Sequence, residues 1–160
     1  MGLRDRLRGL LERPTHLSES SAAPEIGVAD TSGKVWKIND LRGRAAVIYF
    51  YPKDDTPGCT KEACAFRDAT ERFGNVALFG VSTDAADSHR AFAQKFNLGF
   101  PLLADTTGEM AKRWGVLGRT GHARRATFVI DREGRISRIF DPAVVDGHAD
   151  AVLAAVRELP

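Results

Sequence analysis

Short apolar runs alternate with amphipathic segments along most of this chain. Residues 45–51, 76–82 and 126–130 are apolar over nearly their whole length and rich in β-branched and aromatic side chains. Runs of this length and composition are typical of buried strands. These three segments are therefore predicted to form the central strands of a sheet that lies inside the protein.

Helical patterns lie between and after these strands. One covers about residues 59–73, and a second runs to about Phe96 with Asp84 or Asp87 as its cap. A third covers residues 146–159 at the C-terminal end. Two strand–helix units followed by a hairpin and a final helix predict the α/β class, with a mixed central β-sheet flanked by helices.

Shorter elements complete the predicted fold, and most of them are bounded by turn-forming residues. The alternating pattern predicts a small hairpin between Ile26 and Ile38. The other short elements are a one-turn helix at 41–42 capped by Asn39 or Asp40, a strand near 101–103, a helix at 109–114, and a strand at 135–140 that follows a turn at 131–134.

Residues 1–23 form an N-terminal extension to a domain predicted at 24–160. Leucines and arginines alternate at helical spacing before Pro14, and residues 18–23 are interpreted as a linker. Such a helix could dock on a partner, a second subunit or an anionic membrane surface. A short helix is a weak anchor, so packing on its own domain or fraying is the favoured interpretation.

Composition narrows the function classes. A chain of 160 residues that is 43% hydrophobic can form one domain with a proper core, and a net charge of +2 gives no indication of nucleic-acid binding. No apolar run approaches the ~18 residues of a membrane span, and no signal peptide is evident. Two cysteines do not make a disulfide scaffold, and a cytoplasmic location with both as thiols is expected.

Cys59 stands where a polar turn passes into a helical pattern. Pro52 ends the preceding strand, and good helix formers begin at Thr60. A helix N-terminus favours an anion, and it can lower a thiol pKa from its usual ~8.5. Cys59 is therefore either a reactive thiol or a small buried side chain, and its polar neighbours argue against deep burial.

Cys64 follows five residues later. Within one helix the two cysteines would be ~7.5 Å apart along the axis and roughly 140° apart around it. A disulfide needs Cα atoms within about 7 Å and convergent Cβ vectors. A permanent bridge is therefore not expected, and a transient one requires the helix to unwind. The spacing also differs from the Cys-x-x-Cys of thioredoxin-type dithiols.

The cysteine segment carries a family resemblance. Pro52-x-x-x-Thr56-x-x-Cys59 resembles the active-site motif of peroxiredoxins, and the whole stretch 51–64 is similar to their bacterioferritin-comigratory-protein branch, also called the Q type. Family-like segments also occur at 81–84, 100–105 and 127–131, so the resemblance spans about 24–160. It implies a thioredoxin-like fold and reduction of hydrogen peroxide and organic hydroperoxides.

The resemblance also implies roles for individual residues. Cys59 would be the peroxidatic nucleophile and Cys64 the resolving partner. Thr56 would offer its hydroxyl to the peroxide, and Pro52 would shape the turn and shield the sulfur from water. The sulfenic acid formed at Cys59 would then condense with Cys64 to a disulfide.

A cation is expected near the sulfur, and Arg124 and Arg125 are the candidates. Adjacent strand residues point to opposite faces, so one of them is expected to reach the site. The family pattern selects Arg125 and leaves Arg124 as a solvated charge. Glu62 matches a family position and could orient Arg125, or it could serve only as favourable charge in a first helical turn.

The implied partners are a hydroperoxide and an external dithiol, thioredoxin or a relative. No metal or organic cofactor is implied, and a monomer is expected. The segment 118–121 is interpreted as a flexible connection, not a phosphate loop. The histidines are interpreted as surface or structural residues: His16, His89, His122 and His148.

Two alternatives to a peroxidase remain open from the sequence. A thiol–disulfide oxidoreductase could use the same fold, although the missing Cys-x-x-Cys argues against it. A peroxide-sensing redox switch or holdase would share the first chemical step at Cys59, so the sequence does not separate it from a peroxidase.

Overall fold

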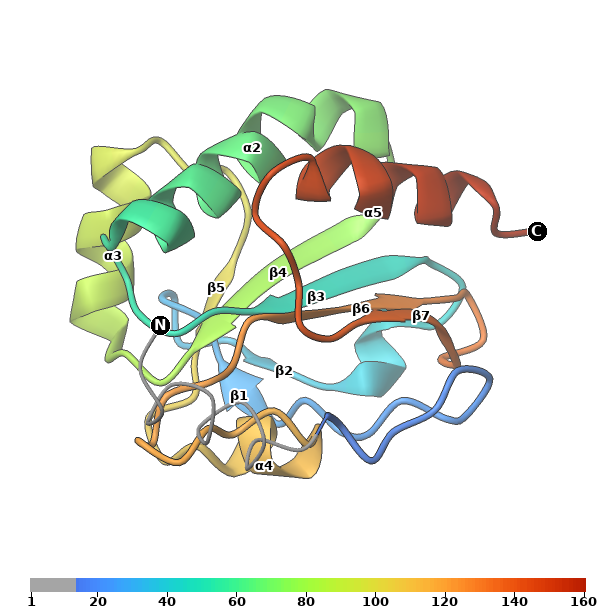
Figure 1. The fold of residues 1–160 in the computed structure, drawn as a ribbon, viewed down its shortest axis with the longest axis horizontal. Coiled ribbons are helices and arrows are strands. Elements are labelled where there is room, and N and C mark those ends of the chain that lie inside the picture. The colour runs from blue at the N-terminus through green and yellow to red at the C-terminus, as the bar shows by residue number, and fades with distance from the viewer. Residues whose placement is uncertain (1–13) are drawn as a thin grey trace, which may run out of the picture.

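A mixed five-stranded sheet forms the centre of the computed structural model, which describes residues 14–160. The amphipathic helix expected before Pro14 lies outside these residues. The order across the sheet is β5-β4-β3-β6-β7, with β3, β4 and β5 parallel and β6 and β7 antiparallel to their neighbours (Figure 1). The strands are β3 (Ala46–Phe50), β4 (Ala77–Ser82), β5 (Leu102–Ala104), β6 (Ala126–Ile130) and β7 (Ile136–Phe140).

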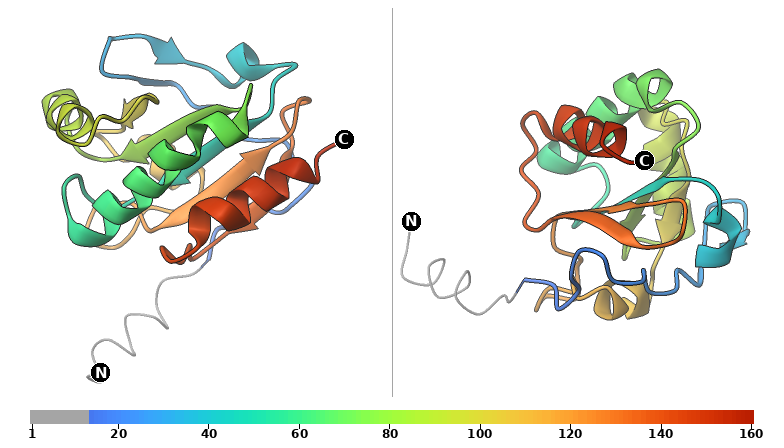
Figure 2. Two further views of the ribbon diagram at one scale, coloured as in Figure 1. Left: turned by 90° about the horizontal axis from the view of Figure 1, so that it is seen from above. Right: turned by 90° about the vertical axis from the view of Figure 1, so that its right-hand side faces the viewer.

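Helices cover one face of this sheet, and a thinner layer covers the other. The first face carries α2 (Pro57–Phe73), α3 (Ala86–Lys95) and α5 (His148–Arg157), and Figure 2 shows α2 and α5 side by side. The opposite face carries α4 (Glu109–Arg113), a 3₁₀ helix (Ile38–Leu41) and a hairpin of β1 (Val28–Ala29) and β2 (Val35–Trp36). The predicted α/β class and the thioredoxin-like fold are confirmed.

The side chains of successive β3 residues point alternately into the two hydrophobic cores. Ile48 and Phe50 point into the core under α4, whereas Val47 and Tyr49 point into the core under α2 and α5. Strand side chains alternate between faces, so a strand covered on both faces must be apolar throughout. The sequence pattern found these central strands for that reason.

Several helix ends differ from the sequence prediction, and α5 is two residues shorter at each end than the predicted 146–159. α2 begins at Pro57, two residues earlier than predicted, because proline is well suited to the first helical turn. The predicted caps of α3 are wrong: Ala85 occupies the N-cap position, and no side chain caps the helix. Asp84 instead accepts hydrogen bonds from the backbone N–H of Asp54 at 2.8 Å and the hydroxyl of Ser82 at 2.6 Å.

Residues 18–23, interpreted above as a linker, lie along the sheet. The backbone N–H of Ser20 donates to Ile136 at 2.7 Å, and the Ile136 N–H donates back to Ser21 at 2.9 Å. Ala23 also packs against the core on the α4 side. This stretch is therefore joined to β7 and does not run free. Within 14–160 no helix is long and apolar enough to cross a membrane.

Candidate active site

The loop between β3 and α2 brings Cys59 to the start of a long helix. Thr56 holds the N-cap position, its carbonyl accepts the Thr60 N–H at 2.8 Å, and Cys59 is the third residue of α2. The side chain is 2% exposed, so the expectation of shallow burial is wrong. The helix turns Cys59 toward the sheet, where it joins the core under α2 and α5, while Lys53 and Asp55 of the preceding loop are exposed.

Asp54 anchors this loop to α3 and to the end of β4. Its buried carboxylate accepts hydrogen bonds from Tyr51 at 2.6 Å and Ser88 at 2.8 Å, and it lies 2.7 Å from Nδ1 of His89. Burial alone would raise the pKa of Asp54, but the hydrogen bonds from His89, Tyr51 and Ser88 outweigh it and lower the pKa. The position of the cysteine loop therefore depends on a buried charge.

His89 completes the same anchor. Its Nε2 lies 2.9 Å from the carbonyl oxygen of Leu103, so both ring nitrogens face acceptors. Asp54, Asp84 and His89 also stand close enough together to be considered as a metal-binding group. Their polar atoms already bond to one another and to neighbouring groups, which makes this cluster a structural clamp.

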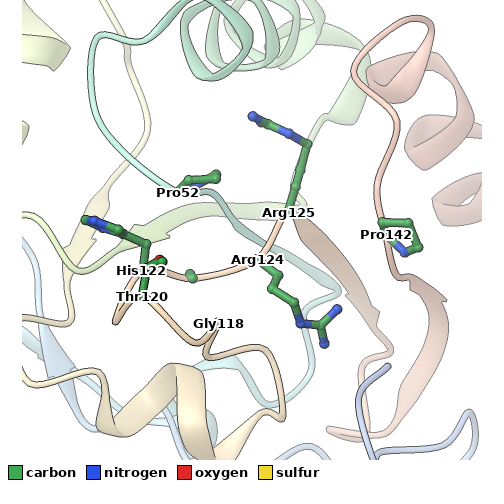
Figure 3. A pocket seen from close by; sticks show the side chains of 8 residues that line it. Pro52, Gly118, Thr120, His122, Arg124, Arg125 and Pro142 are labelled. Atoms are coloured by element: carbon green, nitrogen blue, oxygen red, sulfur yellow. The ribbon is translucent and has the colours of Figure 1, made fainter. Parts of the chain in front are cut away.

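Arg125 contacts the sulfur from the start of β6. It immediately precedes β6, and its Nη2 donates to Sγ of Cys59 at 3.3 Å. Arg124 points the other way, as Figure 3 shows, and pairs with Asp141 at 2.6 and 3.1 Å. The Arg124 side chain is 12% exposed, so its expected role as a solvated charge is wrong. Strand alternation separates the two arginines as predicted.

Glu62 lies one turn beyond Cys59 and is almost fully buried, at 1% exposure. Its Oε1 accepts a hydrogen bond from Nη1 of Arg125 at 2.7 Å, so the guanidinium joins the carboxyl group to the sulfur. Burial raises the pKa of Glu62 to about 7, against the lowering effect of Arg125. Burial also opposes the charge on Arg125, but Glu62 and Cys59 raise its pKa overall.

Thr56 and Pro52 belong to the loop that leads from β3 into α2. The hydroxyl of Thr56 donates a hydrogen bond to the carbonyl of Lys53 at 2.9 Å. The hydroxyl oxygen can still accept a hydrogen bond from another group. Pro52 and Arg125 line a pocket of about 390 Å³ (Figure 3). The other lining residues are Gly118, Thr120, His122, Ala123, Arg124 and Pro142. The segment expected to be a flexible connection therefore forms one wall of this pocket.

Cys64 lies on the same uninterrupted helix as Cys59, and both thiols are free. Cys64 is half-buried, whereas Cys59 is buried. Because α2 is continuous across both residues, a disulfide between them would require the helix to unwind locally.

The sequence predicted His148, the first residue of α5, to be a surface or structural residue and gave it no place at the site. Its ring is 4% exposed, and Nε2 lies 2.7 Å from Oγ1 of Thr127 and 3.9 Å from Oε2 of Glu62. Strand alternation could have placed Thr127 on the same face as Arg125. No sequence signal reports that α5 packs beside α2, so the approach of His148 could not be found.

A buried cysteine that pairs with a guanidinium at the start of a helix, on a thioredoxin-like sheet, defines a thiol-dependent redox protein. The AhpC/TSA family model matches residues 20–139, and this chain belongs to that family. Its relatives place it in the peroxiredoxin branch named after the bacterioferritin comigratory protein and peroxiredoxin Q, so the resemblance seen at residues 51–64 is confirmed.

Two curated relatives illustrate the similarity. A protein named peroxiredoxin bcp from Coxiella burnetii is 41% identical over 140 residues, which are 82% of this chain and 93% of that protein. The chloroplastic peroxiredoxin Q of Oryza sativa subsp. japonica is 42% identical over 78% of this chain, and the match spans 59% of its longer sequence.

Solved structures agree in fold. The peroxidoxin BcpB of Mycobacterium tuberculosis superposes with a TM-score of 0.84 at 33% identity, and the match covers 91% of this chain and 99% of that one. Peroxiredoxin Q of Xanthomonas campestris gives a TM-score of 0.79 at 31% identity over 89% of this chain and 96% of that one.

Proposed function

We propose that this protein is a thiol-dependent peroxidase in which Cys59 reduces hydrogen peroxide and organic hydroperoxides. The observation that carries the proposal is the 3.3 Å contact between Nη2 of Arg125 and the sulfur of Cys59 at the start of α2. A fixed guanidinium and free helix N–H groups stabilise a thiolate, and the thiolate is the nucleophilic form. Membership of the AhpC/TSA family supports the same activity.

In the proposed first step, the thiolate of Cys59 attacks one oxygen of the peroxide. The S–O bond forms as the O–O bond breaks, and the leaving oxygen takes a proton to become water or an alcohol. Cys59 becomes a sulfenic acid. Arg125 donates hydrogen bonds to the developing negative charge, and the oxygen of Thr56 can accept a hydrogen bond from the O–H group of the peroxide. The pocket beside Pro52 and Arg125 provides the approach.

In the proposed second step, the thiol of Cys64 attacks the sulfenic sulfur. An S–S bond forms and water leaves, after the first turns of α2 have unwound. An external dithiol, thioredoxin or a similar protein, then reduces the disulfide and regenerates both thiols. This chemistry uses no metal or organic cofactor. The cytoplasmic location and monomeric state expected from the sequence stay predictions.

Peroxide consumption coupled to thioredoxin tests both cysteine roles in wild type, Cys59→Ser and Cys64→Ser. We expect Cys59→Ser to lose turnover, and Cys64→Ser to react with one equivalent of peroxide but to turn over poorly. Equal turnover in all three proteins would refute the assignment.

The alternatives give different results. A thiol–disulfide oxidoreductase would reduce insulin disulfides efficiently, and a redox switch would stop after one turnover in the wild type with thioredoxin present. A peroxidase is expected to do neither.

A further inference from the structure

The buried polar contacts at the active site continue beyond Glu62 to α5. From the sulfur, they pass through Arg125 to Oε1 of Glu62, and then from Oε2 across 3.9 Å to Nε2 of His148. Nε2 in turn lies 2.7 Å from the hydroxyl of Thr127. Each of these side chains is buried except Arg125, whose side chain is 18% exposed.

Oε2 is the unsatisfied atom in this series. It is buried and has no hydrogen-bond partner among residues 14–160, although buried carboxyl oxygens normally have one. Nε2 of His148 lies 3.9 Å from it. A movement of about 1 Å by the Glu62 side chain would bring the two atoms to hydrogen-bond distance.

The surroundings of His148 keep its ring fixed and neutral. The edges of Phe66 and Phe140 meet it at centroid distances of 5.7 and 5.3 Å, both in T-shaped geometry. Burial and the charge of Arg125 lower the pKa of His148 to about 4. The ring therefore does not add a charge near the sulfur at neutral pH.

A neutral imidazole nitrogen can serve Glu62 in either protonation state. If Nε2 carries a hydrogen, it can donate to an ionised carboxylate or to the oxygen of Thr127. If Nε2 has a free lone pair, it can accept a hydrogen bond from a protonated carboxyl group or from the Thr127 hydroxyl. An apolar side chain of similar volume could fill the same space but could do neither.

We propose that His148 is a positioning residue for the peroxidatic site, and that its Nε2 exchanges its one hydrogen bond between Thr127 and Glu62. It orients the free oxygen of Glu62, so that Oε1 stays on Arg125 and the guanidinium stays on Cys59. The proposal rests on the function proposed above, because it concerns the same sulfur. Its observable consequence is the reactivity of Cys59 as a function of pH.

The groups that face Glu62 come from several elements. Cys59 belongs to α2, Arg125 and Thr127 to β6 and the residue before it, and His148 to α5. The hydroxyl of Tyr49, from β3, is also buried, and burial together with the charge of Glu62 raises its pKa well above the usual range. Tyr49 therefore stays protonated at neutral pH, whereas the carboxyl group of Glu62 titrates in this range.

Alkylation of Cys59 by iodoacetamide tests the proposal in a Cys64→Ser background, where one thiol remains. We expect His148→Leu to slow alkylation at pH 7 roughly three- to tenfold and to raise the pH midpoint of the reaction by about half to one unit. His148→Gln, whose amide can reach a similar position, should restore the rate to within about twofold.

A second substitution separates positioning from packing. In a Glu62→Gln background, His148→Leu should cause no further change in the pH midpoint, because the two residues act through one contact. An equal fall in both backgrounds, an unchanged rate in His148→Leu, or no recovery in His148→Gln would overturn the proposal. Thermal melting reports any general loss of packing separately.

Thr127→Val provides the test if His148→Leu does not fold. It keeps the ring and the shape of the strand residue but removes the hydroxyl that competes with Glu62 for Nε2. A rise in the alkylation rate of about twofold or more supports the proposal, and an unchanged or lower rate overturns it. If the Cys64→Ser parent forms no sulfenic acid with peroxide, the proposed function fails instead, because alkylation does not depend on peroxide.

Discussion

Arg125 donates hydrogen bonds to two buried groups that lie one turn apart on α2. Its Nη1 donates to Glu62 at 2.7 Å, and its Nη2 donates to Cys59 at 3.3 Å. The carboxyl group therefore fixes the cation that faces the sulfur. Substitutions of Arg125 or Glu62 should therefore change the reactivity of the Cys59 thiol.

Replacing Arg125 with lysine tests this geometry. An ammonium is a point charge and cannot hold two partners in the fork geometry of a guanidinium. Loss of a hydrogen bond to a charged group costs about 1.5–3 kcal/mol, so we expect a roughly ten- to hundredfold slower reaction of Cys59 with peroxide at pH 7. Stopped-flow kinetics measures this rate. Arg42→Lys, at an exposed arginine, should leave the rate unchanged, and a wild-type rate in Arg125→Lys would contradict the expectation.

Glu62 should make the stability of the protein depend on pH. Its pKa is about 7 in the folded protein and near 4.5 when the chain is unfolded. The folded state therefore holds a proton that the unfolded state releases, and this stabilisation is full below about pH 4.5 and lost as pH rises through 7. Between pH 5 and pH 8, urea unfolding should show that the wild type loses about 2–3 kcal/mol of stability relative to Glu62→Gln. The comparison is made between the two proteins because the lowered pKa of His148 acts in the opposite direction in both.

A control for this measurement is Glu133→Gln, at an exposed glutamate in the turn before β7. It should keep the pH dependence of the wild type. The same pH dependence in Glu62→Gln as in the wild type would show that the carboxyl group is ionised in both states.

Asp54→Ala should destabilise the protein strongly. The substitution removes the partner of Tyr51, Ser88 and His89 together and leaves the buried polar atoms of Tyr51 and His89 without it. Each buried polar group left without its hydrogen-bond partner costs about 1–3 kcal/mol, which chemical denaturation can measure. The matched control is Asp55→Asn at the exposed neighbour, where the ion pair with Lys95 is worth at most about 1 kcal/mol. Equal effects at both positions would contradict the anchoring role.

Gly80→Ala should disturb the packing of the helix that carries Cys59. A Cβ atom at this position would lie 2.8 Å from the Leu102 side chain and 2.9 Å from the ring of Tyr49, which stacks on Phe66 of α2. Overpacking of this kind costs about 1–3 kcal/mol in unfolding free energy. Gly99→Ala, with no atom within 4 Å of the added carbon, is the control and should change stability little. A wild-type melting temperature in Gly80→Ala would show that Tyr49 moves freely.

The fold could be predicted from the sequence because the strands β3 and β6 are buried on both faces and are apolar at nearly every position. Short-range features were harder to predict. Asp84 has the usual side chain for a helix cap, but its carboxylate instead accepts bonds from Asp54 and Ser82, which lie outside its helix. Local propensity cannot report such tertiary competition.

The site was predicted in part. The resemblance selected Arg125 over Arg124, and strand alternation explains why the two side chains diverge. The depth of Cys59 was misjudged because loop polarity describes the neighbours and not the direction in which the helix turns the sulfur. The contact between His148 and Glu62 depends on how α5 packs against α2, and no local pattern encodes it.

Glu62 stands between the two cysteines on α2, three residues after Cys59 and two before Cys64. In the proposed cycle, the unwinding that joins the sulfurs must also pull this carboxyl group away from Arg125. A protein with the disulfide closed therefore has no assembled centre for attacking a second peroxide. Each turnover then includes one disassembly and one rebuilding of the site, and the rate at which α2 refolds sets an upper limit on the speed of the enzyme.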